Sequence, residues 1–185
     1  VALAALFACF TFQLYAVLTF LPTVLVELHG HSQATASRAA ALTLVGSASA
    51  GALAGRAMHR GVPPRAVVLA GFGLLGVVVP GLALVVQAPA AGVALLLLHG
   101  LAGGAVATAI YAWAPRRTSA ARLGPTMGWI MTGNAAGILL GPPVVGALAQ
   151  AGASWLQAAV LPALVAGAGA AGAWWLGRSD PTPVG

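Results

Sequence analysis

Long apolar runs alternate with short polar turns along the whole chain. A helix needs about 20 apolar residues to cross the roughly 30 Å hydrocarbon core of a bilayer, and six runs of the sequence approach or exceed that length. The pattern predicts an all-α polytopic membrane protein whose six transmembrane helices form one domain, residues 1–178. The expected helices cover residues 2–26, 39–55, 66–86, 90–114, 125–149 and 155–176, and residues 179–185 form a tail.

The amino-acid composition supports a membrane protein. The chain is 60% hydrophobic and 5% charged, whereas a soluble domain carries about 25% charged residues. The net charge of +6 does not indicate a nucleic-acid partner, because the arginines are scattered over short loops without an aromatic stacking pattern. Glu27, His29 and His31 are residue types that bind metal ions, but an exposed polar loop explains them better. We therefore expect no metal and no cofactor.

The arginines predict how the helices are oriented. An arginine at the bilayer centre costs roughly 2.5–3.5 kcal/mol, so arginines mark helix ends. Six crossings place seven arginines on one side, within residues 56–65 and 116–122 and at Arg178, and only Arg38 on the other. The positive-inside rule makes the seven-arginine side cytoplasmic, so both termini and the tail are expected in the cytoplasm.

The positions of the aromatic residues agree with this topology, and the overall composition indicates the kind of cell. Most tryptophans and tyrosines fall near the cytoplasmic helix ends, where an interfacial aromatic belt is expected: Tyr111, Trp113, Trp129, Trp174 and Trp175. Alanine is abundant and lysine is absent, which suits a GC-rich bacterial genome. We expect a multi-pass protein of the bacterial inner (plasma) membrane, with the lipid bilayer as its surroundings.

Glycines at four-residue spacing predict close packing between helices. Gly133, Gly137 and Gly141 form a double step that runs directly into Pro142 and Pro143. Small residues at this spacing let helix backbones approach closely in lipid, and a proline inside a helix removes backbone hydrogen bonds and kinks it. We predict a bent, closely packed fifth helix. Single pairs with the same spacing occur at Gly51/Gly55 and Gly100/Gly104.

Three segments resemble the major facilitator superfamily. The turn at residues 55–65, GRAMHRGVPPR, is similar to the superfamily's loop motif G-x-x-x-D-R-x-x-x-R/K-R/K in its second-half copy. Gly55, Arg60 and Arg65 match the motif, whereas His59 replaces its acid and Pro64 one of its bases.

Two further segments carry the same resemblance. Residues 133–146 resemble the superfamily's glycine-rich eleventh helix, which contains a Gly-Pro step, and residues 12–23 resemble its seventh helix, most like the cyanate-permease-like branch. The chain then resembles the C-terminal six of twelve helices, one half of a major facilitator fold.

The resemblance implies a mechanism and a partner. It implies secondary active transport by alternating access around a midplane site between two halves, each built from inverted three-helix repeats. Residues 1–88 and 89–177 show no convincing similarity to each other. The implied partner is a missing N-terminal six-helix half or a second copy. The resemblance also implies a gating loop at Gly55, Arg60 and Arg65, in which Arg60 either latches helix ends or is a plain positive-inside arginine.

A few polar residues at membrane depth are candidate substrate contacts, because such residues usually face the bundle interior or a water-filled path. His99 is the only acid or base near mid-membrane, so it either binds substrate or a proton or is a neutral histidine bonded to another helix. Gln13 lies at a comparable depth. Tyr15 lies on a different face from Gln13, and Asn134 is as well suited to joining helices as to binding substrate.

Three functions compete. The first is a transporter of a small organic solute or anion. Its proton coupling would use either His99 or an acid in a missing half. The second is a rhomboid-like intramembrane protease, which needs a histidine on its last helix; residues 155–176 contain none, so we expect no enzyme and no catalytic residue. The third is a half-size membrane scaffold or a homodimerising transporter.

Overall fold

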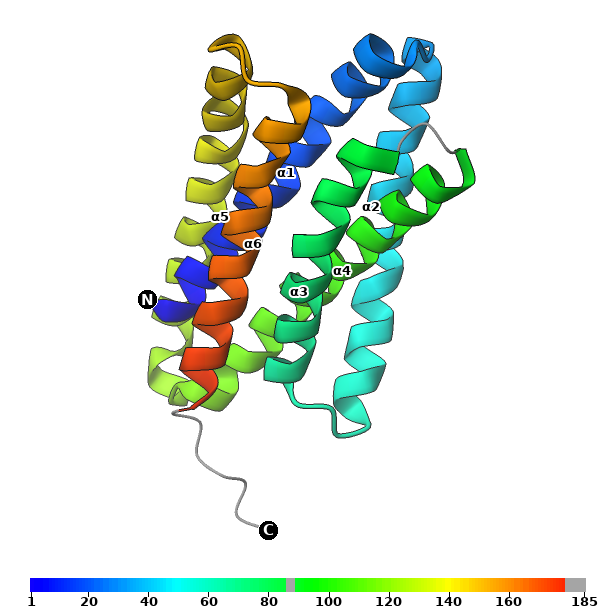
Figure 1. Ribbon diagram of the computed structural model, residues 1–185. Coiled ribbons are helices and arrows are strands. Elements are labelled where there is room, and N and C mark those ends of the chain that lie inside the picture. Colours follow the sequence, from blue (N-terminus) through cyan, green and yellow to red (C-terminus); the bar gives the residue numbers. More distant parts are fainter. Residues whose placement is uncertain (86–88, 179–185) are drawn as a thin grey trace.

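The computed structural model describes residues 1–85 and 89–178, without the side chains of residues 28, 29, 83–85, 89 and 90. This part of the chain forms six helices that alternate in direction (Figure 1), which confirms the predicted all-α fold. The helices are α1 (Ala2–His29), α2 (Gln33–His59), α3 (Pro64–Val85), α4 (Pro89–Arg117), α5 (Ala120–Gln150) and α6 (Trp155–Gly177). The predicted tail, residues 179–185, lies outside the described residues.

Several helices extend beyond the ranges that hydropathy predicts, because a helix continues past its apolar segment until a capping group ends it. α2 begins at Gln33 instead of residue 39, since the hydroxyl of Ser32 accepts a hydrogen bond (3.2 Å) from the backbone N–H of Thr35. α1 ends at His29 and is capped by Gly30, whose φ of 64° is a left-handed conformation that favours glycine. Hydropathy therefore indicates the membrane-buried part of each helix and not its capped ends.

Among the described residues, five helices are long and apolar enough to cross a membrane, and α2 is the exception. α2 is 27 residues long, but serine, threonine and glycine lower its hydropathy. The backbone of α2 satisfies one of these polar side chains, since Oγ of Ser49 donates a hydrogen bond (3.0 Å) to the carbonyl of Val45. α2 runs along the bundle beside the other helices (Figure 1) and packs most extensively against α4.

The helices pack in a pattern that repeats after three helices. The most extensive interfaces join α2 to α4 and α1 to α5; α3 also packs against α4 and α6, and α6 against α1. Exchanging α1, α2 and α3 for α4, α5 and α6 converts α2·α4 into α1·α5 and α3·α4 into α1·α6, and it leaves α3·α6 unchanged. Because consecutive helices alternate in direction (Figure 1), a shift by three helices reverses direction. The packing therefore has the inverted three-helix repeat that the sequence does not reveal.

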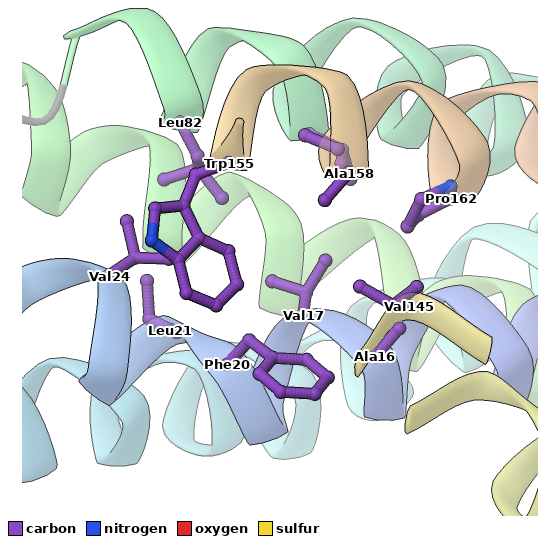
Figure 2. Close-up of a pocket in the computed structure, with 12 residues that line it drawn as sticks. Ala16, Val17, Phe20, Leu21, Val24, Leu82, Val145, Trp155, Ala158 and Pro162 are labelled. Carbon is purple, nitrogen blue, oxygen red and sulfur yellow. The ribbon is translucent and has the colours of Figure 1, made fainter. Parts of the chain in front are cut away.

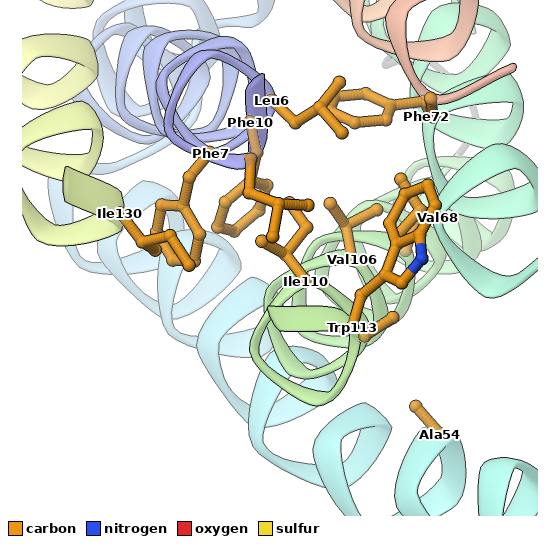
Figure 3. Packing of buried hydrophobic residues seen from close by; sticks show 14 of the residues in the cluster. Leu6, Phe7, Phe10, Ala54, Val68, Phe72, Val106, Ile110, Trp113 and Ile130 are labelled. Atoms are coloured by element: carbon orange, nitrogen blue, oxygen red, sulfur yellow. The ribbon is translucent and has the colours of Figure 1, made fainter. Parts of the chain in front are cut away.

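Most large core side chains gather in one part of the bundle, where α1, α3, α4 and α5 meet (Figure 3). They include Leu6, Phe7, Phe10, Val68, Phe72, Ile110, Trp113 and Ile130. Trp113 is only 2% exposed, so its placement in the interfacial belt is wrong: this face of α4 points into the core and not toward the headgroups. Trp129, Trp174 and Trp175 are exposed, as side chains in an interfacial belt would be.

Candidate functional site

A polar pair connects α1 and α4 in the interior of the bundle. Gln13 and His99 are both 0% exposed, and Nε2 of His99 donates a hydrogen bond to Oε1 of Gln13 (3.3 Å). Each residue lies near the middle of a long apolar helix. The fold thus brings together two of the candidate residues that the sequence analysis singled out separately.

The pair keeps unused hydrogen-bonding capacity. Nε2 of Gln13 and Nδ1 of His99 are buried and have no hydrogen-bond partner among the described residues, and the same holds for Oγ1 of Thr43. Thr43 is fully buried on α2, where its backbone contacts Gly100, the neighbour of His99. A buried polar group without a partner costs about 1–3 kcal/mol, and such groups are rare in native proteins. These atoms are an amide donor, a ring-nitrogen acceptor and a hydroxyl, each able to form a further hydrogen bond.

The other two candidates lie apart from this pair. Tyr15 is 38% exposed, on a face of α1 that differs from the buried face of Gln13. Asn134 is half-buried on α5, and its backbone carbonyl lies within hydrogen-bonding distance (3.2 Å) of Oγ1 of Thr11 on α1. In the part of the chain that the structure describes, neither side chain forms a hydrogen bond with Gln13 or His99. Their substrate-binding role stays a prediction.

The loop-motif residues have different surroundings. Arg60 ends α2 through its backbone N–H, which donates to the carbonyls of Arg56 and Ala57 (both 3.1 Å), and its side chain is exposed. A methyl group at Gly55 would have nothing within 4 Å. Only Arg65 reaches another helix, because its Nη1 donates to the carbonyl of Gly177 at 3.1 Å.

A second arginine joins Arg65 at the end of α6. Nη1 of Arg117, at the end of α4, donates to the carbonyl of Leu176 (3.0 Å), and its guanidinium lies 5.6 Å from the ring centroid of Trp113. Two positive charges thus face the last carbonyls of α6, where the helix dipole is negative. These two arginines fasten α6 to the start of α3 and the end of α4.

Sequence reasoning missed Thr11, Thr43 and Arg117. Thr11 stands between two phenylalanines and Thr43 between two leucines, and only the approach of a neighbouring helix buries their hydroxyls. The available signal was the glycine spacing, since Gly100 and Gly137 lie opposite these two threonines. The metal-site alternative for Glu27, His29 and His31 depends on His29, whose side chain lies outside the described residues.

The fold and the buried pair define a multi-pass helical membrane protein with polar chemistry inside its bundle, as membrane transporters have. The family model of the Major Facilitator Superfamily matches residues 1–185, the whole chain. The chain belongs to this superfamily of membrane transporters. No curated protein matches the sequence.

Proposed function

We propose that the chain is the C-terminal half of a secondary active transporter that moves a small organic solute or anion together with protons. The observation that carries this proposal is the buried hydrogen bond between His99 and Gln13. It joins α1 and α4, the first helices of the two repeats, and transporters of this kind bind substrate near the midplane where repeats meet.

Proton coupling follows from the chemistry of His99. The one acidic side chain that the structure describes, Glu27, is exposed at the end of α1, so within the described residues no buried carboxylate competes for this role. Protonation of His99 would convert Nδ1 from an acceptor into a donor and add a positive charge inside the bundle. A buried charge is stable only when it is paired, and an anionic substrate that enters with the proton supplies that partner.

Alternating access requires a second six-helix unit opposite this one. We propose an N-terminal half as that unit, with a second copy of this chain as the alternative. The arginine-rich turns between α2 and α3 and between α4 and α5 lie at the same end of the bundle (Figure 1), which supports placing that end in the cytoplasm of a bacterial cell. Residues 12–23 favour the cyanate-permease-like branch within the superfamily.

The test is uptake into proteoliposomes that contain the intact protein. Radiolabelled small carboxylates and cyanate are offered with and without an imposed inward pH gradient. We expect a pH gradient to accelerate uptake by the wild type. His99→Gln should retain hydrogen bonding to Gln13 and lose the acceleration, because an amide does not take up a proton at neutral pH.

Two variants complete this test. His59→Ala is the matched control, because His59 is an exposed histidine at the end of α2 and its loss should leave coupling unchanged. Gln13→Ala should raise the substrate concentration needed for half-maximal uptake. Equal uptake and equal coupling in the wild type, His99→Gln and Gln13→Ala would remove both residues from the site.

A further inference from the structure

A pocket whose lining includes neither Gln13 nor His99 lies between α1, α3, α5 and α6. Its inner part is a cavity of about 70 Å³. Side chains from four helices line it, and Figure 2 shows Phe20 and Trp155 beside it together with small residues of α1 and α6. Among the twelve side chains of its lining, the indole of Trp155 is the only one that carries a polar atom. An apolar cavity of this kind stays dry and takes apolar groups.

An open hollow of about 520 Å³ adjoins this cavity, and Phe20 and Trp155 line both spaces. The two rings lie 5.7 Å apart between centroids at an angle of 42°. The hollow also contains Thr23, Glu27 and Gln150. Neither arginine nor histidine occurs in its lining as far as the described residues extend. Glu27 therefore gives the hollow a negative charge in a chain whose net charge is +6.

We propose that this pocket binds a free hydrophobic ammonium compound, with its alkyl group in the cavity and its cationic head in the hollow. Two aromatic rings and one carboxylate around an open space are the groups that recognise alkylammonium ions. The adjoining dry cavity adds an apolar contact for the rest of the molecule. The negative charge of Glu27 would repel an anion, and a cation without an apolar group would leave the cavity unfilled.

The size of the cavity favours a single short tail over a lipid. A cavity of roughly 150 Å³ holds one benzene molecule, so a cavity of about 70 Å³ has room for only the inner end of a short alkyl tail. A membrane lipid carries two chains that are each far longer. The site involves neither Gln13 nor His99, so it stands or falls independently of the proposed transport function.

Calorimetric titration of the intact protein in maltoside micelles tests this site with three probes. Hexyltrimethylammonium should bind in a saturable manner with one molecule per chain. Tetramethylammonium, which has no tail, should bind about tenfold more weakly, because methylene burial is lost. Hexanoate, which has a similar tail and the opposite charge, should not bind. Equal binding of hexanoate would overturn the proposal.

Two variants assign each part of the pocket. Glu27→Gln should weaken hexyltrimethylammonium binding about fivefold, the scale of a partly exposed ion pair, and leave folding intact because Glu27 is exposed. Ala159→Leu should fill the cavity and abolish the advantage of the hexyl tail. Ala171→Leu is its matched control, because Ala171 is exposed on the same helix and lines neither space.

The remaining outcomes are also decisive. Unchanged binding in Glu27→Gln, or equal losses in Ala159→Leu and Ala171→Leu, would refute this site. Added phosphatidylethanolamine should not displace the probe. Complete displacement by that lipid would show that the pocket holds a lipid ammonium group in place of a free compound, and would also refute the proposal.

Discussion

The two largest interfaces of the bundle, α1·α5 and α2·α4, occupy equivalent places in the two repeats but place their glycines differently. In α1·α5 the glycines stand on α5, where Gly133, Gly137 and Gly141 meet the backbone of α1. In α2·α4 glycines stand on both helices: Gly100 and Gly104 of α4 meet the backbone of α2, and Gly46 of α2 meets the backbone of α4. Close approach needs a small residue on only one side, so either helix can provide it. Packing geometry is therefore repeated although sequence is not.

The two interfaces also differ in how their polar groups are satisfied. At α1·α5, Oγ1 of Thr11 lies within hydrogen-bonding distance of the carbonyls of Phe7 (3.0 Å) and Asn134 (3.2 Å). At α2·α4, Oγ1 of Thr43 has no partner among the residues that the structure describes, and His99 lies directly beside Gly100. A buried threonine hydroxyl is thus paired at the first interface and, among the described residues, unpaired at the second. This difference can be tested by substitution.

The largest effect is expected at the centre of α1·α5. A side chain at Gly137 would overlap Oγ1 of Thr11 and the backbone of Ala8 and Phe12, so Gly137→Leu must separate the helices. We expect a loss of about 3 kcal/mol in the free energy of unfolding, measured by denaturation in mixed micelles. Gly128→Leu is the matched control, because nothing lies within 4 Å of a side chain there. Similar stabilities of the two variants would contradict this packing.

A smaller loss is expected from a single methyl group at α2·α4. Gly100→Ala places its methyl group against the carbonyl of Thr43 and should cost about 2 kcal/mol. Uptake should fall as well, because the displaced segment of α4 carries His99. Gly73→Ala, at a position on α3 with open space around it, should leave both stability and uptake unchanged. If Gly100→Ala retained wild-type stability, the close approach of α2 to α4 would be disproved.

A matched pair of threonine substitutions compares the two interfaces directly. Thr11→Val removes a hydroxyl that has partners and should cost about 0.6 kcal/mol, the mean for hydrogen bonds between membrane helices. Thr43→Val removes a hydroxyl that has none and should leave stability equal or slightly higher. Uptake should respond in the opposite order, falling only in Thr43→Val. A larger stability loss in Thr43→Val than in Thr11→Val would reverse the comparison.

The smallest effect is expected outside both interfaces, at the end of α6. Arg65→Ala removes one of two guanidinium groups from the last carbonyls of α6 and should cost about 0.5 kcal/mol, because Arg117 still bonds to Leu176. Thermal unfolding followed by tryptophan fluorescence suits this measurement, since Trp174 and Trp175 lie nearby in sequence. Arg60→Ala is the control and should have no effect. A loss as large as that of Gly137→Leu would show that this contact dominates stability.

Much of the fold could be predicted because hydropathy is local. Runs of about 20 apolar residues specify membrane helices wherever they pack, and glycine spacing marks the surfaces that approach one another. α2 has the weakest apolar signal of these helices, because serine, threonine and glycine interrupt its apolar residues. The candidate residues Gln13 and His99 were also visible, since polar side chains are conspicuous in an apolar run.

The sequence by itself determined that this protein is a helical membrane protein, how many helices it has and that Gln13 and His99 are polar side chains within apolar helices. Only the tertiary structure decided that Gln13 bonds to His99, that Arg65 and Arg117 meet at α6, that Trp113 is a core residue and that Glu27 shares a hollow with two aromatic rings. The physical reason is that helix formation depends on neighbouring residues along the chain. Burial, pairing and cavities depend on which helices pack together, and small residues on either partner allow the same packing.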